Sequence, residues 1–108
     1  MCTGIMPLLP ELAELEFDCL LGVEPVATGQ DLRRMVKALG DKKSFWTGVS
    51  APLQIGRAAP DEVRQAVRDA FDVFGRDGFL LSAVPTIRRQ WPWTNVEAML
   101  DEYRRIER

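Results

Sequence analysis

Apolar residues recur at helical spacing in four stretches of the chain, residues 8–15, 32–39, 63–74 and 96–103. A spacing of three or four residues places such side chains on one face of a helix, so each stretch predicts a helix. The third stretch has the most continuous apolar stripe. Pro60 and Gly75 flank it as residues that favour the first turn and the end of a helix.

Three short apolar runs alternate with these helices: residues 17–23 (FDCLLGV), 44–49 (SFWTGV) and 79–81 (FLL). Their length is that of buried strands, and we place the end of the third strand before Ser82 and a loop at residues 86–91. The order is α-β-α-β-α-β-α, with connections long enough to require parallel neighbours. We therefore predict an α/β fold, a partial TIM-barrel-like unit with three parallel strands, in one domain at residues 1–108.

Local signals place two helix starts. Thr94 and Glu97 have the spacing of a capping box at the start of the last helix, with Trp93 positioned to pack on Ala98. Thr28 or Gly29 is expected to cap the second helix.

The predicted sheet is incomplete by physical criteria. A parallel sheet needs cover on both faces, and three strands leave two unpaired edges. The first helix also lacks the strand that would normally precede it. The pattern is that of three βα units taken from a larger structure, and we expect pairing with another copy of the chain, giving a homo-oligomer, or with a missing barrel segment.

Composition narrows the class of protein. The 108 residues are 46% hydrophobic and 28% charged, which is typical of a soluble globular domain. The net charge of −2 gives no electrostatic case for nucleic acid, and no apolar run approaches the roughly 20 residues of a membrane span. Two cysteines are too few for a disulfide framework, so we expect a reduced, cytoplasmic setting.

Three segments resemble, in order, the C-terminal third of the uroporphyrinogen decarboxylase family, a (β/α)8-barrel family that includes cobalamin-dependent methyltransferase relatives. MCTGIMPLLPELAELEFDCLLGVEP is similar to its H-x-C/D-G segment with the following helix and strand. GDKKSFWTGVSAP resembles its G-D-x-x-x-x-x-G-x stretch. GFLLSAVPTIRRQWPWTNVEAML resembles its closing G-G-[FY]-I-L-[AS]-P-x-H-x-I … P-x-x-N-V-x-A-M signature. The resemblance implies a carboxy-lyase of porphyrin biosynthesis.

The departures from the family pattern concern activity. The two family histidines fall on Met1 and Pro85, and the sequence has no histidine at all. The family's Arg and Asp groups that grip the tetrapyrrole belong to the N-terminal part of the barrel, which this chain does not contain. We therefore expect no decarboxylation by this chain alone, assign no catalytic residue and expect no cofactor.

Candidate ligand-binding residues follow the predicted strands, on the side where barrels hold their ligands. Arg88 and Arg89 could clamp a carboxylate of a tetrapyrrole or another small acidic ligand, or could be solvated or paired with a helix. Trp91 could line an apolar pocket or pack a loop on a helix. The remaining candidates are Glu24, Ser50 and Ser82, each of which could instead bond a loop or cap a helix.

Two cysteines could be zinc ligands, as in the methyltransferase relatives. Zinc requires three or four ligands, and the chain has only Cys2 and Cys19 and no histidine. A small buried hydrophobe is the alternative for Cys19, which lies within a predicted strand. We therefore expect no metal site.

Two classes of function remain. The chain is part of a uroporphyrinogen-decarboxylase-like enzyme, in the decarboxylase or the methyltransferase branch, and lines its active-site mouth. Alternatively, it is a non-enzymatic half-barrel that self-associates and binds a ligand or partner. The second class rests on the absent histidines and the open sheet edges, and the resemblance favours the first class.

Overall fold

The computed structural model describes residues 5–26, 31–40 and 42–107, and its helices and strands follow the predicted order. A 3-10 turn, η1 (Met6–Leu8), leads into a short first helix, and the connection after the second strand contains one π-helical turn, η2 (Ala51–Ile55). The helices are α1 (Leu9–Glu14), α2 (Leu32–Leu39), α3 (Pro60–Phe74) and α4 (Trp93–Glu107). The strands are β1 (Cys19–Leu21), β2 (Ser44–Ser50) and β3 (Phe79–Val84).

The three strands form one parallel sheet in the order β1-β2-β3, as predicted. The register alternates between two rows that point to opposite faces. Leu20, Phe45 and Phe79 are paired across the strands and pack against the helices. The next row, Leu21, Trp46 and Leu80, points to the other face and is exposed.

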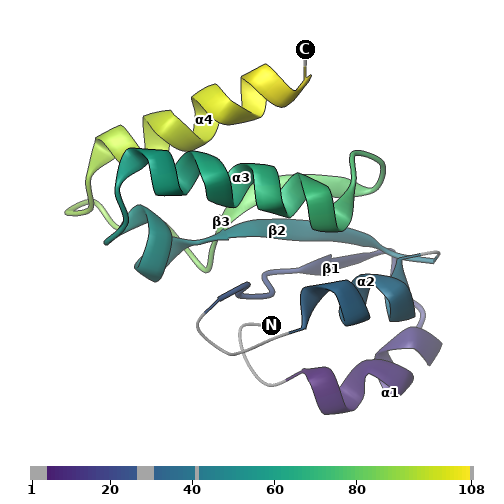
Figure 1. Cartoon of the computed structure of the whole chain (residues 1–108). Coiled ribbons are helices and arrows are strands. Elements are labelled where there is room, and N and C mark those ends of the chain that lie inside the picture. The colour runs from purple at the N-terminus through teal and green to yellow at the C-terminus, as the bar shows by residue number, and fades with distance from the viewer. Residues whose placement is uncertain (1–4, 27–30, 41, 108) are drawn as a thin grey trace.

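All four helices cover the same face of the sheet and form a continuous row (Figure 1). One hydrophobic cluster joins α1, α2 and part of α3 to β1 and β2, and a second joins α3 and α4 to β2. The ring of Phe74 connects the helix layer to the sheet, with centroids 5.2 Å from Phe45 and 5.0 Å from Phe79. In the described residues the helices therefore lie on one side of the sheet, and on the other side the row Leu21, Trp46 and Leu80 is exposed.

The helix ends follow from local chemistry. The carboxylate of Asp31 accepts a hydrogen bond from the Arg34 N–H at 3.1 Å and caps α2. The predicted caps Thr28 and Gly29 lie outside the described residues. Pro60 begins α3 as predicted, and Gly75, with a φ of 75°, ends it.

Two predicted strand limits are wrong. β3 continues through Ser82 to Val84 because each residue as far as Val84 has a parallel partner in β2. β1 is shorter than residues 17–23, since only Cys19–Leu21 pair with β2. An apolar run shows that a segment is buried, but the neighbouring strand decides where pairing starts and stops.

Two side-chain predictions also need correction. Cys19 is exposed, because it alternates with the buried Leu20 and shares the open face with Leu21. In the first helix only Leu9 and Leu12 are buried, whereas Leu8 and Leu15 are exposed. Cys2 lies outside the described residues.

Gly48, in the middle of β2, is required by both its backbone and its neighbours. Its φ is 147°, and a Cβ atom there would lie 2.6 Å from the Leu81 Cδ1 atom and 3.3 Å from the Ser82 carbonyl oxygen. A side chain at this position would strain the backbone and press on β3. Gly48 is the second glycine of the segment that resembles the G-D-x-x-x-x-x-G-x stretch.

Candidate functional site

The carboxyl ends of β2 and β3 meet at one edge of the sheet, because the strands are parallel and adjacent. The segment after β2 contains the π-helical turn, and the segment after β3 runs through residues 85–92 into α4. These two connections lie next to each other, since both are tied to the first turn of α4. Ligands of parallel α/β proteins bind at this edge of the sheet.

A pocket of about 340 Å³ lies between the two connections. Its volume is within the range of small-molecule sites. One wall is Pro52 from the segment after β2, and the remainder comes from the segment after β3. The lining residues are Pro52, Pro85, Thr86, Arg88, Gln90 and Trp91.

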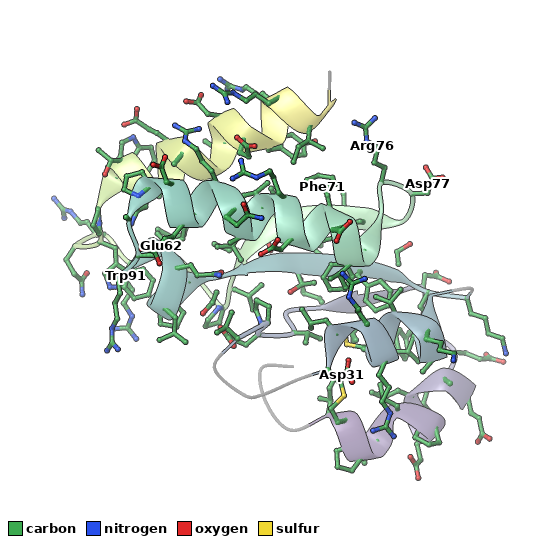
Figure 2. The ribbon with its side chains drawn as sticks, in the orientation of Figure 1. Asp31, Glu62, Phe71, Arg76, Asp77 and Trp91 are labelled. Atoms are coloured by element: carbon green, nitrogen blue, oxygen red, sulfur yellow. The ribbon has the colours of Figure 1, made fainter. Side chains whose placement is uncertain are left out.

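The Trp91 ring packs closely against the backbone of Gly56. A Cβ atom on Gly56 would lie 3.0 Å from Cε2 of Trp91 and 2.7 Å from the carbonyl oxygen of Pro52. The backbone N–H of Trp91 also donates a hydrogen bond to the Arg88 carbonyl oxygen at 3.1 Å. Figure 2 shows Trp91 at the same end of the molecule as Glu62, which lies in the first turn of α3, and far from Arg76 and Asp77. The half-buried indole therefore has a defined place in the pocket wall.

Asn95 fixes the segment after β2 to α4. Its buried side-chain amide donates hydrogen bonds to the carbonyl oxygens of Ile55 and Ala58, both at 2.8 Å. The same segment is tied at its start, where the Ser50 N–H donates to Gln54 Oε1 at 2.8 Å. These bonds satisfy polar groups that would otherwise be buried without partners. They also set the position of Pro52 relative to Trp91.

Arg88 and Arg89 are both exposed, and only Arg88 lines the pocket. Neither guanidinium takes part in an ion pair with the residues that the structure describes. The alternative of a salt bridge to a helix is therefore not formed, and a solvated loop remains. Of the six predicted binding residues, the structure brings Arg88 and Trp91 together in one pocket.

Glu24, Ser50 and Ser82 have local roles or lie elsewhere. The Glu24 carboxylate is buried and accepts a hydrogen bond from the Val26 N–H at 2.8 Å. The fully buried Ser50 hydroxyl accepts from the Leu53 N–H at 3.4 Å, at the start of the π-helical turn. Ser82 is half-buried within β3. None of the three lines the pocket with Arg88.

The predicted start of the last helix is displaced. α4 begins at Trp93, so Thr94 lies inside the helix and does not cap it. Trp93 is 65% exposed, so it does not pack on Ala98 as predicted. Because a capping box with Thr94 as the cap would start the helix at Asn95, α4 begins two residues earlier than this spacing predicts.

Residues 5–26, 31–40 and 42–107 contain no group of three or more His, Cys, Asp or Glu side chains placed to hold a metal ion. No described helix is long and apolar enough to cross a membrane.

Comparison with known proteins gives a result at the level of structure. No protein-family model matches the sequence, and no curated protein matches it. A methyltransferase from Methanosarcina mazei is similar in structure, with a TM-score of 0.75 and 19% sequence identity over 99% of this chain. The fold is that of a partial (β/α) barrel. The chain spans 30% of the methyltransferase's length, and this likeness shows a related fold without singling out the uroporphyrinogen decarboxylase family.

Six contributors to the pocket were not among the predicted binding residues. Pro52, Pro85, Thr86 and Gln90 line it, and Gly56 and Asn95 position its walls. The asparagine of the P-x-x-N-V-x-A-M segment was an available signal, because a polar residue among buried apolar helix positions needs partners. Gly56 gave no such signal, since its role depends on where a distant indole lies.

Proposed function

We propose that this chain forms the C-terminal wall of the ligand pocket of a uroporphyrinogen-decarboxylase-like barrel, and that it binds one carboxylated edge of a tetrapyrrole. The observation that carries the proposal is the pairing of Arg88 with Trp91 in one pocket at the carboxyl ends of parallel strands. The resemblance of residues 78–100 to the family's closing signature supports the same placement.

The chemistry of the pocket suits an acidic, flat ligand. A guanidinium without a protein carboxylate can form two parallel hydrogen bonds to a ligand carboxylate. The indole of Trp91 offers an apolar surface against which a pyrrole ring can pack. A pocket of about 340 Å³ is too small for a whole macrocycle, so we assign it to one edge of the ligand.

The pocket has no group suited to the chemical step. Loss of CO2 from an acetate side chain leaves a carbon that must be protonated, which requires a proton donor of suitable pKa. The side chains that line this pocket are apolar, amide, hydroxyl and guanidinium, and the sequence contains no histidine. Within this proposal the chain contributes binding, and the proton donor belongs to other parts of the barrel.

A second candidate is methyl transfer. The structurally similar protein from Methanosarcina mazei is a methyltransferase, and the family that the sequence resembles includes methyltransferases. In that case Arg88 and Trp91 would line the mouth of a methyltransferase barrel. The two candidates differ in the ligand that the pocket takes.

The test is titration of the chain with uroporphyrin, the stable oxidised form of the tetrapyrrole, followed by porphyrin absorbance. Arg88→Ala is expected to weaken binding about tenfold or more, because a hydrogen bond to a charged group contributes about 1.5–3 kcal/mol. Arg89→Ala is the matched control, since Arg89 is also exposed but does not line the pocket.

A porphyrin whose carboxylates are esterified serves as the control ligand. Equal binding of the ester, or equal loss of binding in the two arginine variants, would contradict carboxylate recognition by Arg88. Binding would then be nonspecific adsorption to apolar surface.

A further inference from the structure

The outer face of α4 carries two large apolar side chains in one column. Trp93 is 65% exposed and Leu100 is 41% exposed. They are seven positions apart, which is about two helical turns, so both side chains leave the helix in nearly the same direction. The opposite face carries the buried Ala98 and Glu102 and packs on α3. Figure 1 shows α4 at the end of the row of helices, where its outer face is not covered by another described element.

Two opposite charges flank this column, one on each side of Leu100. Glu97 lies three positions before Leu100 and Arg104 four positions after it, and both side chains are exposed. Neither forms an ion pair or a side-chain hydrogen bond with the residues that the structure describes. The two residues are about 10 Å apart along the helix axis, so they do not pair with each other. An acidic and a basic group therefore remain available on one exposed face.

A two-fold rotation makes this charge pattern complementary to itself. The midpoint between Glu97 and Arg104 falls between Leu100 and Asp101. When two copies of α4 lie antiparallel across an axis at that point, Glu97 of each copy faces Arg104 of the other. A parallel arrangement would place like charges together. The pattern therefore fits an antiparallel partner that carries the same charges at the same spacing, which is a second copy of this chain.

The centre of such a contact is apolar, and the remaining charge near it is compensated. Leu100 lies next to the axis, so the two leucines pack on each other. Trp93 lies toward the end of the contact and covers the last turn of the other α4. Asp101 is also close to the axis, but its carboxylate pairs with Arg64 of its own chain at 3.6 Å. Each acidic group at the axis therefore has a cation of its own chain beside it.

We propose that the outer face of α4 binds the same face of a second copy of this chain, as an antiparallel two-fold dimer with Leu100 at its centre and two Glu97–Arg104 ion pairs. The contact lies in the helix layer, on the side away from the sheet, and does not pair the strands. It does not include the pocket that contains Arg88, so the inference is independent of the ligand proposed above. A contact along one helix is a small interface, and we expect the dimer to dissociate on dilution.

Sedimentation equilibrium of the purified chain over a range of concentrations measures the association. The average mass should rise toward twice the 12.2 kDa of the chain, and added salt should weaken the association because the ion pairs are exposed. Glu97→Arg or Arg104→Glu should each raise the Kd of the dimer about tenfold or more, since each substitution brings like charges together at both symmetric contacts.

Lys37→Glu is the matched control for Arg104→Glu. It makes the same change in net charge at an exposed position of α2, away from the proposed contact, and should leave the Kd of the dimer unchanged. A second control is the chain with both Glu97→Gln and Arg104→Gln. It should dimerise more weakly than the unmodified chain and without the salt dependence.

A mixture of the Glu97→Arg and Arg104→Glu variants is the decisive sample. Each variant alone brings like charges together, but in a mixed pair the two basic groups of one variant face the two acidic groups of the other. The mixture should therefore dimerise at least as tightly as the unmodified chain. Circular dichroism checks that each variant keeps its helices, and if a reversal disrupts them the chain with both glutamine substitutions decides the test.

Three results would overturn the inference. The first is a chain that stays monomeric at every concentration. The second is an association that neither the charge reversals nor the glutamine substitutions weaken, because the contact would then lie elsewhere on the surface. The third is a mixture of folded reversal variants that does not recover the association, since the two charges would then not face each other.

Discussion

The side chain of Asn95 donates a hydrogen bond to the carbonyl oxygen of Ile55, which lies 40 positions earlier in the chain and 2.8 Å from the amide nitrogen. The same nitrogen donates to the carbonyl oxygen of Ala58. One buried amide thus joins the first turn of α4 to the end of the π-helical turn. This link sets the distance between the two connections that form the candidate pocket.

Asn95→Ala should destabilise the chain by about 2–4 kcal/mol, because one buried and one partly buried carbonyl group lose their donor. Urea unfolding followed by circular dichroism measures the change. Thr94→Ala is the control, since Thr94 is the exposed neighbour in the same helical turn. Similar losses in the two variants would show that the Asn95 hydrogen bonds contribute little.

Gly48→Ala should lower the free energy of unfolding by about 1–3 kcal/mol, because the backbone at this position is strained for alanine. A further decrease is expected because the Leu81 side chain must move. Gly75→Ala separates the two causes, because its φ is also positive but no atom lies within 4 Å of an added Cβ. Thermal unfolding of both variants tests the difference. Equal losses would mean that the contact with Leu81 is relieved without cost.

Arg68 and Glu102 join α3 to α4 through a 2.6 Å bond to a carboxylate whose side chain is only 6% exposed. Arg68→Met should therefore lower the free energy of unfolding by about 1–3 kcal/mol, because the buried Glu102 carboxylate loses its main partner. Arg33→Met is the control, since the Arg33–Asp72 pair is 69% and 76% exposed and should change stability by less than about 1 kcal/mol. Equal effects in urea unfolding would contradict the difference in burial.

The register assigns Leu80 and Leu81 to opposite faces of β3. Leu80→Thr should leave stability within about 0.5 kcal/mol, because Leu80 faces the open side of the sheet. Leu81→Thr should cost about 1.5–3 kcal/mol, because Leu81 packs against both hydrophobic clusters. A larger loss for Leu80→Thr in urea unfolding would mean that this face is already covered in solution.

The order of helices and strands was predictable because it depends on hydrophobic period, which is local. The stripe of α3 and its limits at Pro60 and Gly75 are the clearest case. The extension of β3 to Val84 was not predictable from the sequence. Its last residues contain no strong apolar run, and they belong to the strand because they pair with β2. The exposure of Cys19 likewise depends on which face of the sheet lacks a neighbour.

The candidate site was predictable in part for a similar reason. Arg88 and Trp91 follow a strand in the sequence, and parallel topology brings such segments to one edge. Pro52 and Gly56 join them only because two connections pack together. Glu24 also follows a strand and Ser50 is the last residue of β2, but their side chains form hydrogen bonds to their own loops. The position of a residue after a strand therefore does not show whether its side chain lines a pocket or forms hydrogen bonds to its own loop.

Amide hydrogen exchange of the isolated chain, resolved by residue with NMR, tests the central claim most directly. If the outer edge of β3 is open, the amides of β2 should be protected, and alternate amides of β3 should exchange rapidly. Equal protection of β2 and β3 would contradict the account, because the outer edge of β3 would then have to be paired in solution.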